Sequence, residues 1–142
     1  MSTDGNLFRV MNTSASALTA QSVRLNTVAS NLANANTAAT TAEQAYVPKQ
    51  VVFQAVMDRF QPERADVPVK VAGIVGSNAE PLAFYEPSHP QADEQGYVFR
   101  PAISVVEEMA NMTSAARSFE ANVEVMNTTR QLLLRALALG QN

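Results

Sequence analysis

The sequence predicts a mainly α-helical protein with a small β-rich insertion, in which long N- and C-terminal helices pair as a coiled coil. Apolar residues recur every seven positions near the start of the chain and again, over a longer stretch, near its end, while most prolines lie between the two repeats. We expect one structural unit with three segments: an N-terminal coiled-coil helix at 1–36, a linker and small β-rich insertion at 37–100, and a C-terminal coiled-coil helix at 101–142.

The first heptad repeat runs through residues 7–32, which contain neither proline nor glycine. This stretch predicts a helix of about 26 residues, roughly 39 Å long, with Asp4 and Gly5 just before its start. One edge of the repeat carries large residues: Met11, Leu18, Leu25 and Leu32. The other edge, three positions earlier each time, is mostly small: Phe8, Ala15, Ser22 and Ala29.

The second heptad repeat lies between Pro101, a residue typical of the first helical turn, and Gly140, a residue typical of a helix end. Glu107 and Glu108 suit the start of this helix, because negative charge is favourable there. One edge of the repeat consists of Val105, Met112, Phe119, Met126 and Leu133. The other edge consists of Met109, Ala116, Val123, Leu137 and one interruption, Arg130.

The middle of the chain differs in composition. Residues 46–100 hold six of the seven prolines and three of the five glycines. Short β-branched or aromatic runs stand between these turn residues and predict short strands: YVPKQVVFQAVM, VPVKVAGIV, PLAFY and GYVF. The small and polar residues of 33–45 predict a flexible linker.

Composition argues against several functions. A net charge of −3 without a basic stripe disfavours nucleic-acid binding, and the absence of cysteine excludes thiolate chemistry. No run reaches the length of a membrane span, and the first twenty residues do not resemble a cleaved signal peptide. The single histidine, His89, lies between Pro87 and Pro90 and is expected to order a turn. We therefore expect no enzyme activity, cofactor, metal or small-molecule substrate.

Three asparagines, Asn31, Asn34 and Asn36, stand where the first helix is expected to end, in the stretch ASNLANANT. A buried amide without hydrogen bonds costs about 1–3 kcal/mol, so these side chains are either solvated or bonded to a specific partner. Two interpretations stay open: capping of the helix before an exposed linker, or hydrogen bonds that set the register of a neighbouring helix.

Three segments of the sequence resemble the axial proteins of the bacterial flagellum. ALTAQSVRLNTVASNLANANT, at 17–37, is similar to a signature of the rod members, and YEPSHPQADEQGYVFRP, at 85–101, is similar to a segment of the proximal rod proteins. The closing stretch from Glu107 onward also resembles the last helix of that family. Ser30, Phe119 and Ala102 depart from the asparagine, tyrosine and asparagine common in the family.

The resemblance implies a structural subunit of the proximal rod, which polymerises with other rod proteins into a drive shaft that transmits torque from motor to hook. It also implies export by the flagellar type III apparatus without a cleaved signal, a place in the periplasmic part of the basal body, and the MS ring as a further candidate partner. The alternatives are another rod or hook-related component, or a soluble coiled-coil adaptor. The expected assembly residues are Met11, Leu18, Leu25, Asn31, Leu32, Asn34, Asn36, Met112, Phe119, Val123, Met126, Leu133 and Leu137.

Overall fold

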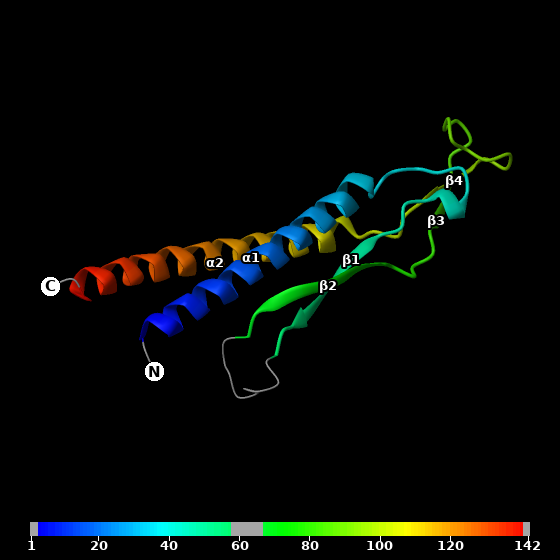
Figure 1. The fold of residues 1–142 in the computed structure, drawn as a ribbon. Helices are drawn as coiled ribbons and strands as arrows, with labels where there is room; N and C mark the ends of the chain where they lie inside the picture. Colours follow the sequence, from blue (N-terminus) through cyan, green and yellow to red (C-terminus); the bar gives the residue numbers. More distant parts are fainter. Residues whose placement is uncertain (1–2, 58–66, 141–142) are drawn as a thin grey trace. The chain divides into compact units, whose positions relative to one another are not determined.

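The structure, a computed structural model, describes residues 3–57 and 67–140. Two long helices enclose a β region in the sequence, so the predicted fold class is confirmed (Figure 1). Of the three segments expected from the sequence, residues 1–2 of the first, 58–66 of the second and 141–142 of the third lie outside the described part. The elements in chain order are α1 (Thr3–Asn34), η1 (Ala42–Gln44), β1 (Lys49–Ala55), β2 (Val69–Gly76), β3 (Leu82–Tyr85), β4 (Tyr97–Arg100) and α2 (Val105–Gly140).

Both helices begin at a different residue from the one expected. Helix α1 includes Asp4 and Gly5, which were expected to precede it; a glycine in a helix costs only about 0.5–1 kcal/mol relative to alanine, which a helix of this length can bear. Helix α2 begins at Val105, so the expectation that Pro101 lies in its first turn is wrong. Pro101 is instead buried in a turn closed by the bond from the Ile103 N–H to the Pro101 carbonyl.

The true start of α2 is set by Ser104. Its hydroxyl accepts a hydrogen bond from the Glu107 N–H, and its carbonyl accepts the Glu108 N–H at 3.0 Å. A serine followed by a glutamate three residues later is a known sequence signature of a helix N-terminus. The signal for the correct boundary was therefore present in the sequence, three residues after the proline.

The chain forms two compact units, and each helix contributes to both. One unit comprises Met1–Val23, Val52–Gly73 and Ser114–Asn142. Within its described part, the Ser16 hydroxyl joins α1 to β2, because it accepts the Val69 N–H at 3.1 Å and donates to the Thr13 carbonyl. The buried residues of this unit are small or carry a hydroxyl: Ser14, Ala20, Ala115 and Thr129.

The second unit comprises Arg24–Val51 and Ile74–Thr113. Here the end of α1 lies against the start of α2, joined by hydrogen bonds from Arg24 to Asn111 and from Asn31 to Glu108. Of these two pairs, the one whose α1 residue is nearer the N-terminus has the α2 residue that is nearer the C-terminus. The two helices therefore run antiparallel in this unit.

Strands β3 and β4 pair antiparallel, with Phe84 opposite Val98 and Tyr85 opposite Tyr97. Val98 is the largest side chain among the described residues that is completely buried. Strands β1 and β2 form a second two-stranded sheet. The two short sheets agree with the strands predicted from the middle of the sequence.

The stretch at 33–45 is not the flexible linker expected from its composition. Ala39 pairs with Phe99 through two backbone hydrogen bonds, at 2.8 and 2.9 Å, and so adds a bridge to β4. Ala35, Ala39 and Ala45 are all buried. Small side chains allow this backbone to lie close to its neighbours, and the pairing with a strand about sixty residues away supplies the order that local sequence lacks.

Candidate functional site

The large heptad edge of α1 is partly covered within the chain. Met11, Leu18, Leu25 and Leu32 are all half-buried. On the other edge, Phe8, Ala15 and Ala29 are exposed and Ser22 is half-buried. Helix α1 therefore leaves an edge of mostly small residues open to solvent.

Helix α2 shows a similar division, but its covered face differs from the seam that the sequence suggested. Phe119, Met126 and Leu133 are half-buried as expected of a seam. They share their face with small or polar residues that repeat every seven positions: Ala115, Asn122, Thr129 and Ala136. The Asn122 amide and the Thr129 hydroxyl each donate to the carbonyl four residues earlier, at 2.7 Å, so burial leaves neither unpaired.

The remaining large residues of α2 face solvent. Met109, Val123 and Leu137 are 58%, 36% and 54% exposed, and Met112 is exposed as well. Met109, Val123 and Leu137 belong to one edge of the heptad repeat, whereas Met112 belongs to the same edge as Phe119; both edges were expected to form the seam. In the chain by itself these four residues contact solvent, because the small-residue face of α2 takes the covered position.

The asparagine tract divides into three different environments. Asn31 is 3% exposed and makes four hydrogen bonds with other parts of the chain. Asn34, the last residue of α1, donates to the Ser30 carbonyl at 2.9 Å and accepts a bond from the Thr37 hydroxyl. Asn36 is exposed, and no side-chain hydrogen bond to it is found among residues 3–57 and 67–140. Only Asn36 thus has an amide fully available to a neighbour.

A polar cleft of about 210 Å³ lies next to Asn31 in the second unit. Arg24 and Asn111 meet across it at 3.2 Å. Its size suits water or a polar side chain better than an organic ligand, since ligand pockets usually measure about 300–1,000 Å³. The lining residues are Arg24, Thr27, Val28, Lys49, Gln50, Val51, Glu108 and Asn111.

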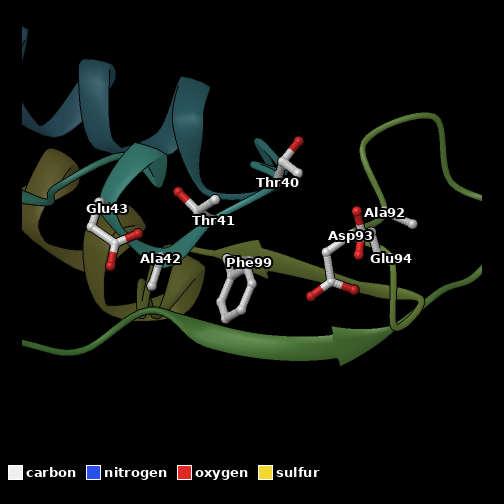
Figure 2. Close-up of a pocket in the computed structure, with 8 residues that line it drawn as sticks. All are labelled: Thr40, Thr41, Ala42, Glu43, Ala92, Asp93, Glu94 and Phe99. Atoms are coloured by element: carbon white, nitrogen blue, oxygen red, sulfur yellow. The ribbon is translucent and has the colours of Figure 1, made fainter.

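A second, more open cleft of about 460 Å³ lies between the 40–43 segment and the loop before β4. In Figure 2 the Phe99 ring lies between Glu43 and Asp93. Hydrogen bonds from the Glu43 backbone and the Thr41 hydroxyl lower the pKa of the Glu43 carboxyl. Asp93 accepts the N–H groups of Gln95 and Tyr97, so it orders the turn into β4. The lining residues are Thr40, Thr41, Ala42, Glu43, Ala92, Asp93, Glu94 and Phe99.

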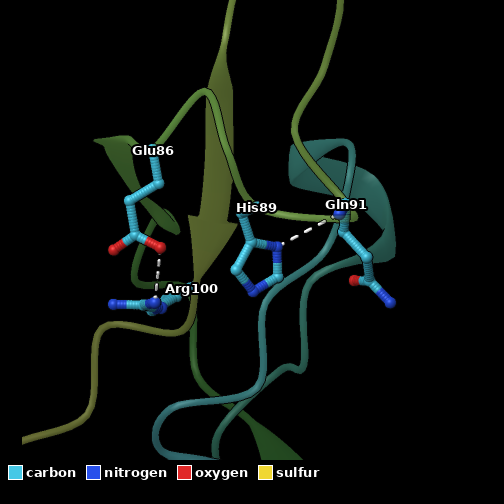
Figure 3. Close-up of polar contacts among 4 residues, drawn as sticks. All are labelled: Glu86, His89, Gln91 and Arg100. Carbon is cyan, nitrogen blue, oxygen red and sulfur yellow. Dashed lines mark hydrogen bonds and ion pairs between the residues drawn. The ribbon is translucent and has the colours of Figure 1, made fainter.

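The loop that contains His89 is held by local polar contacts (Figure 3). The His89 Nδ1 accepts the Gln91 N–H at 3.1 Å, in agreement with the turn-ordering role expected for this residue. The Glu86 carboxylate pairs with the Arg100 guanidinium at 2.9 Å and joins the start of the loop to the end of β4. These contacts engage His89 in structure and offer no paired acid and base.

Two further features bear on chemistry. Among residues 3–57 and 67–140, no three His, Asp or Glu side chains lie where they could hold one metal ion. No described helix has a window both long and apolar enough to cross a bilayer.

Comparison with known proteins agrees with the resemblance seen in the sequence. A family model described as flagella basal body rod protein matches residues 11–38, and one described as flagellar basal body rod FlgEFG protein C-terminal matches residues 94–139. The flagellar basal-body rod protein FlgC of Escherichia coli O6:H1 is 48% identical over 135 residues, covering 95% of this chain and 98% of that protein.

Two further relatives extend the comparison. The FlgC protein of Salmonella typhimurium strain LT2 is 47% identical over the same shares of the two chains, 95% and 98%. That of Bacillus subtilis strain 168 is 38% identical over 149 aligned positions, covering 94% of this chain and 98% of that protein. The chain belongs to the family of the flagellar basal-body rod protein FlgC.

Proposed function

We propose that the chain is a structural subunit of the proximal rod of the bacterial flagellum, where it polymerises with other rod proteins into the shaft that transmits torque from motor to hook. Membership of the FlgC family supports the place in the rod. The observation that supports polymerisation is the pair of heptad edges, one on each helix, that the chain leaves exposed.

The two exposed edges differ in a way that suits packing of one chain on another. The edge on α2 carries large residues such as Met109 and Val123, while the edge on α1 is small at Ala15 and Ala29. Single exposed apolar residues need no explanation, but a repeat of seven is the spacing by which helices pack side by side. Contacts between two different surfaces do not close into a two-fold dimer, and they build an open helical assembly when the rotation between subunits does not close a ring.

The expected assembly residues then fall into three groups. Seven are half-buried within the chain: Met11, Leu18, Leu25, Leu32, Phe119, Met126 and Leu133. Asn31 and Asn34 are hydrogen-bonded within the chain. The last four are exposed and available to neighbouring subunits: Asn36, Met112, Val123 and Leu137. The proposed role is mechanical and requires no catalysis. Its partners are other rod proteins, the flagellar type III export apparatus and, at one end, the MS ring. Its place is the periplasmic part of the basal body, reached without a cleaved signal.

The substitution Val123→Asp tests the α2 edge. An aspartate at this exposed position should leave the monomer folded but place an unpaired carboxylate in the contact with a neighbour, which costs several kcal/mol when buried. We expect loss of swimming and of complete rods in electron micrographs of basal bodies. The matched control is Val106→Asp, a 78% exposed valine of the same helix that lies off this edge.

The outcomes separate the candidate functions. Normal swimming and normal basal bodies with Val123→Asp would contradict the assembly edge. A purified wild-type chain that forms a discrete dimer at all concentrations, in cells whose motility does not need it, would favour the soluble adaptor.

A further inference from the structure

We propose that Asn31 is a positioning residue whose side-chain amide fixes, within one chain, the register between the end of α1, the start of β1 and the start of α2. The proposal rests on the rod function only in its consequence, namely that this register presents the exposed helix edges correctly for assembly. It assigns Asn31 an intramolecular role, in contrast to the contact with a neighbouring chain suggested by the sequence.

The amide of Asn31 is saturated. Its Nδ2 donates to the Lys49 carbonyl at 2.9 Å and to Glu108 Oε2 at 3.0 Å. Its Oδ1 accepts the Lys49 N–H at 2.9 Å and the Tyr46 hydroxyl at 3.0 Å. An asparagine side chain offers two donors and two acceptor sites, so all four are used. Nothing remains with which this amide could bind a neighbouring subunit.

Two of the four bonds go to the N–H and the carbonyl of a single residue, Lys49, the first residue of β1. A side-chain amide has the same donor and acceptor as a peptide group, so Asn31 pairs with Lys49 as a neighbouring strand would. Successive residues of a strand point their backbone groups to opposite sides. A shift of β1 by one residue would therefore break both bonds together, which is why this pairing specifies register.

The other two bonds reach elements far apart in sequence. Glu108 lies in the first turn of α2, 77 positions after Asn31, and Tyr46 lies in the segment before β1. The Ser30 hydroxyl lies 3.1 Å from the Tyr46 oxygen. Since Tyr46 uses its only hydrogen on Asn31, Ser30 must be the donor to Tyr46. One buried side chain thus joins three segments and is supported by a neighbour on its own helix.

The pattern of donors makes asparagine specific at this position. Aspartate has nearly the same shape and could still accept from Lys49 and Tyr46, but it has no hydrogen to donate. Its second oxygen would face both the Lys49 carbonyl and the Glu108 carboxylate at hydrogen-bond distance. Exchange of Glu108 for glutamine would remove one of these repulsions, because the glutamine amide can donate to the aspartate.

The test compares four full-length chains: wild type, Asn31→Asp, the matched control Asn36→Asp, and the double variant Asn31→Asp with Glu108→Gln. Hydrogen exchange of the Lys49 amide is measured on purified monomer by NMR. We expect exchange about tenfold faster or more in Asn31→Asp. Aspartate can still accept the Lys49 N–H, but the two lost donor bonds and the repulsion at its second oxygen should open this junction more often. We expect no change in Asn36→Asp and partial recovery in the double variant.

Unchanged exchange in Asn31→Asp, or an equal acceleration with and without Glu108→Gln, would overturn the proposal. If Asn31→Asp alone does not fold, recovery of the helical circular dichroism signal in the double variant supports the junction, and failure to recover overturns it. Swimming tests the consequence separately: Asn31→Asp should lose motility, and the double variant should recover part of it. Faster exchange in Asn31→Asp together with wild-type swimming would refute the link to assembly.

Discussion

Gly96 is the position where a single methyl group should do the most local damage. It is the one described residue with a left-handed backbone, at φ +86°, and it is buried at the turn into β4. A Cβ there would lie 2.9 Å from Cε2 of Tyr85 and 3.1 Å from Cβ of Pro87. Gly96→Ala therefore combines an unfavourable backbone conformation with two contacts that are too close.

The size of the effect can be worked from these contacts. An alanine in the left-handed region costs about 1–2 kcal/mol. To make room, the Tyr85 ring must shift, which weakens its edge-to-face contact with Tyr97, 5.3 Å between centroids; such a pair is worth about 0.5–1.5 kcal/mol. The lower entropy of the unfolded alanine chain returns about 0.4–1 kcal/mol. We expect the free energy of unfolding to fall by about 2 kcal/mol.

Urea unfolding followed by tyrosine fluorescence measures this change, since the chain has three tyrosines and no tryptophan. The control is Gly73→Ala in β2, where a Cβ would meet nothing within 4 Å and φ is not positive. Alanine should be neutral or stabilising there, because glycine weakens a strand interior. An unfolding midpoint for Gly96→Ala equal to that of wild type would refute the strain argument.

Two further predictions concern Val98 and His89, which lie in the same compact unit as Gly96. Val98→Ala removes two methyl groups from a side chain with 0% exposure, and it should lower the free energy of unfolding, measured in urea, by about 1.5–3 kcal/mol. The control Val52→Ala, at an exposed site, should change the free energy of unfolding by less than about 0.5 kcal/mol. His89→Ala removes the acceptor for the Gln91 N–H and should cost about 1 kcal/mol or less, with an undiminished swimming zone on soft agar; abolished swimming at unchanged stability would indicate a chemical role for His89.

The helices and strands of this fold can be predicted from local sequence. Two features were not predicted correctly: the start of α2 and the ordered structure of the 33–45 stretch. Heptad spacing was sufficient for both helices, and runs of β-branched and aromatic residues were sufficient for the strands. The start of α2 was misplaced because Pro101 is compatible with a first turn, while Ser104 and Glu107 make the cap. The order of the 33–45 stretch could not be predicted, since it depends on pairing of Ala39 with the distant Phe99.

The asparagine tract shows where site prediction from sequence ended. The position of these amides in the sequence indicated that each needs a hydrogen-bond partner or solvent. In the structure the three amides have three different environments. Asn31 is saturated inside the chain, Asn34 bonds to its own helix, and Asn36 is exposed. The partners of Asn31 lie 15 to 77 positions away, so no local pattern could have distinguished it from its two neighbours.

The heptads pose a similar problem with a physical answer. Each helix carries two apolar edges, but a single chain supplies each helix with only one long helical partner, so one edge of each is left open. On α2 the buried face is the one that contains Ala115 and Thr129, which are small. The Thr129 hydroxyl is hydrogen-bonded within its own helix, so burial of this face costs little free energy. Val123 and Leu137 then remain outside, where their burial requires a second chain. A subunit built this way stays incomplete alone, which is the property that an assembling shaft demands of its parts.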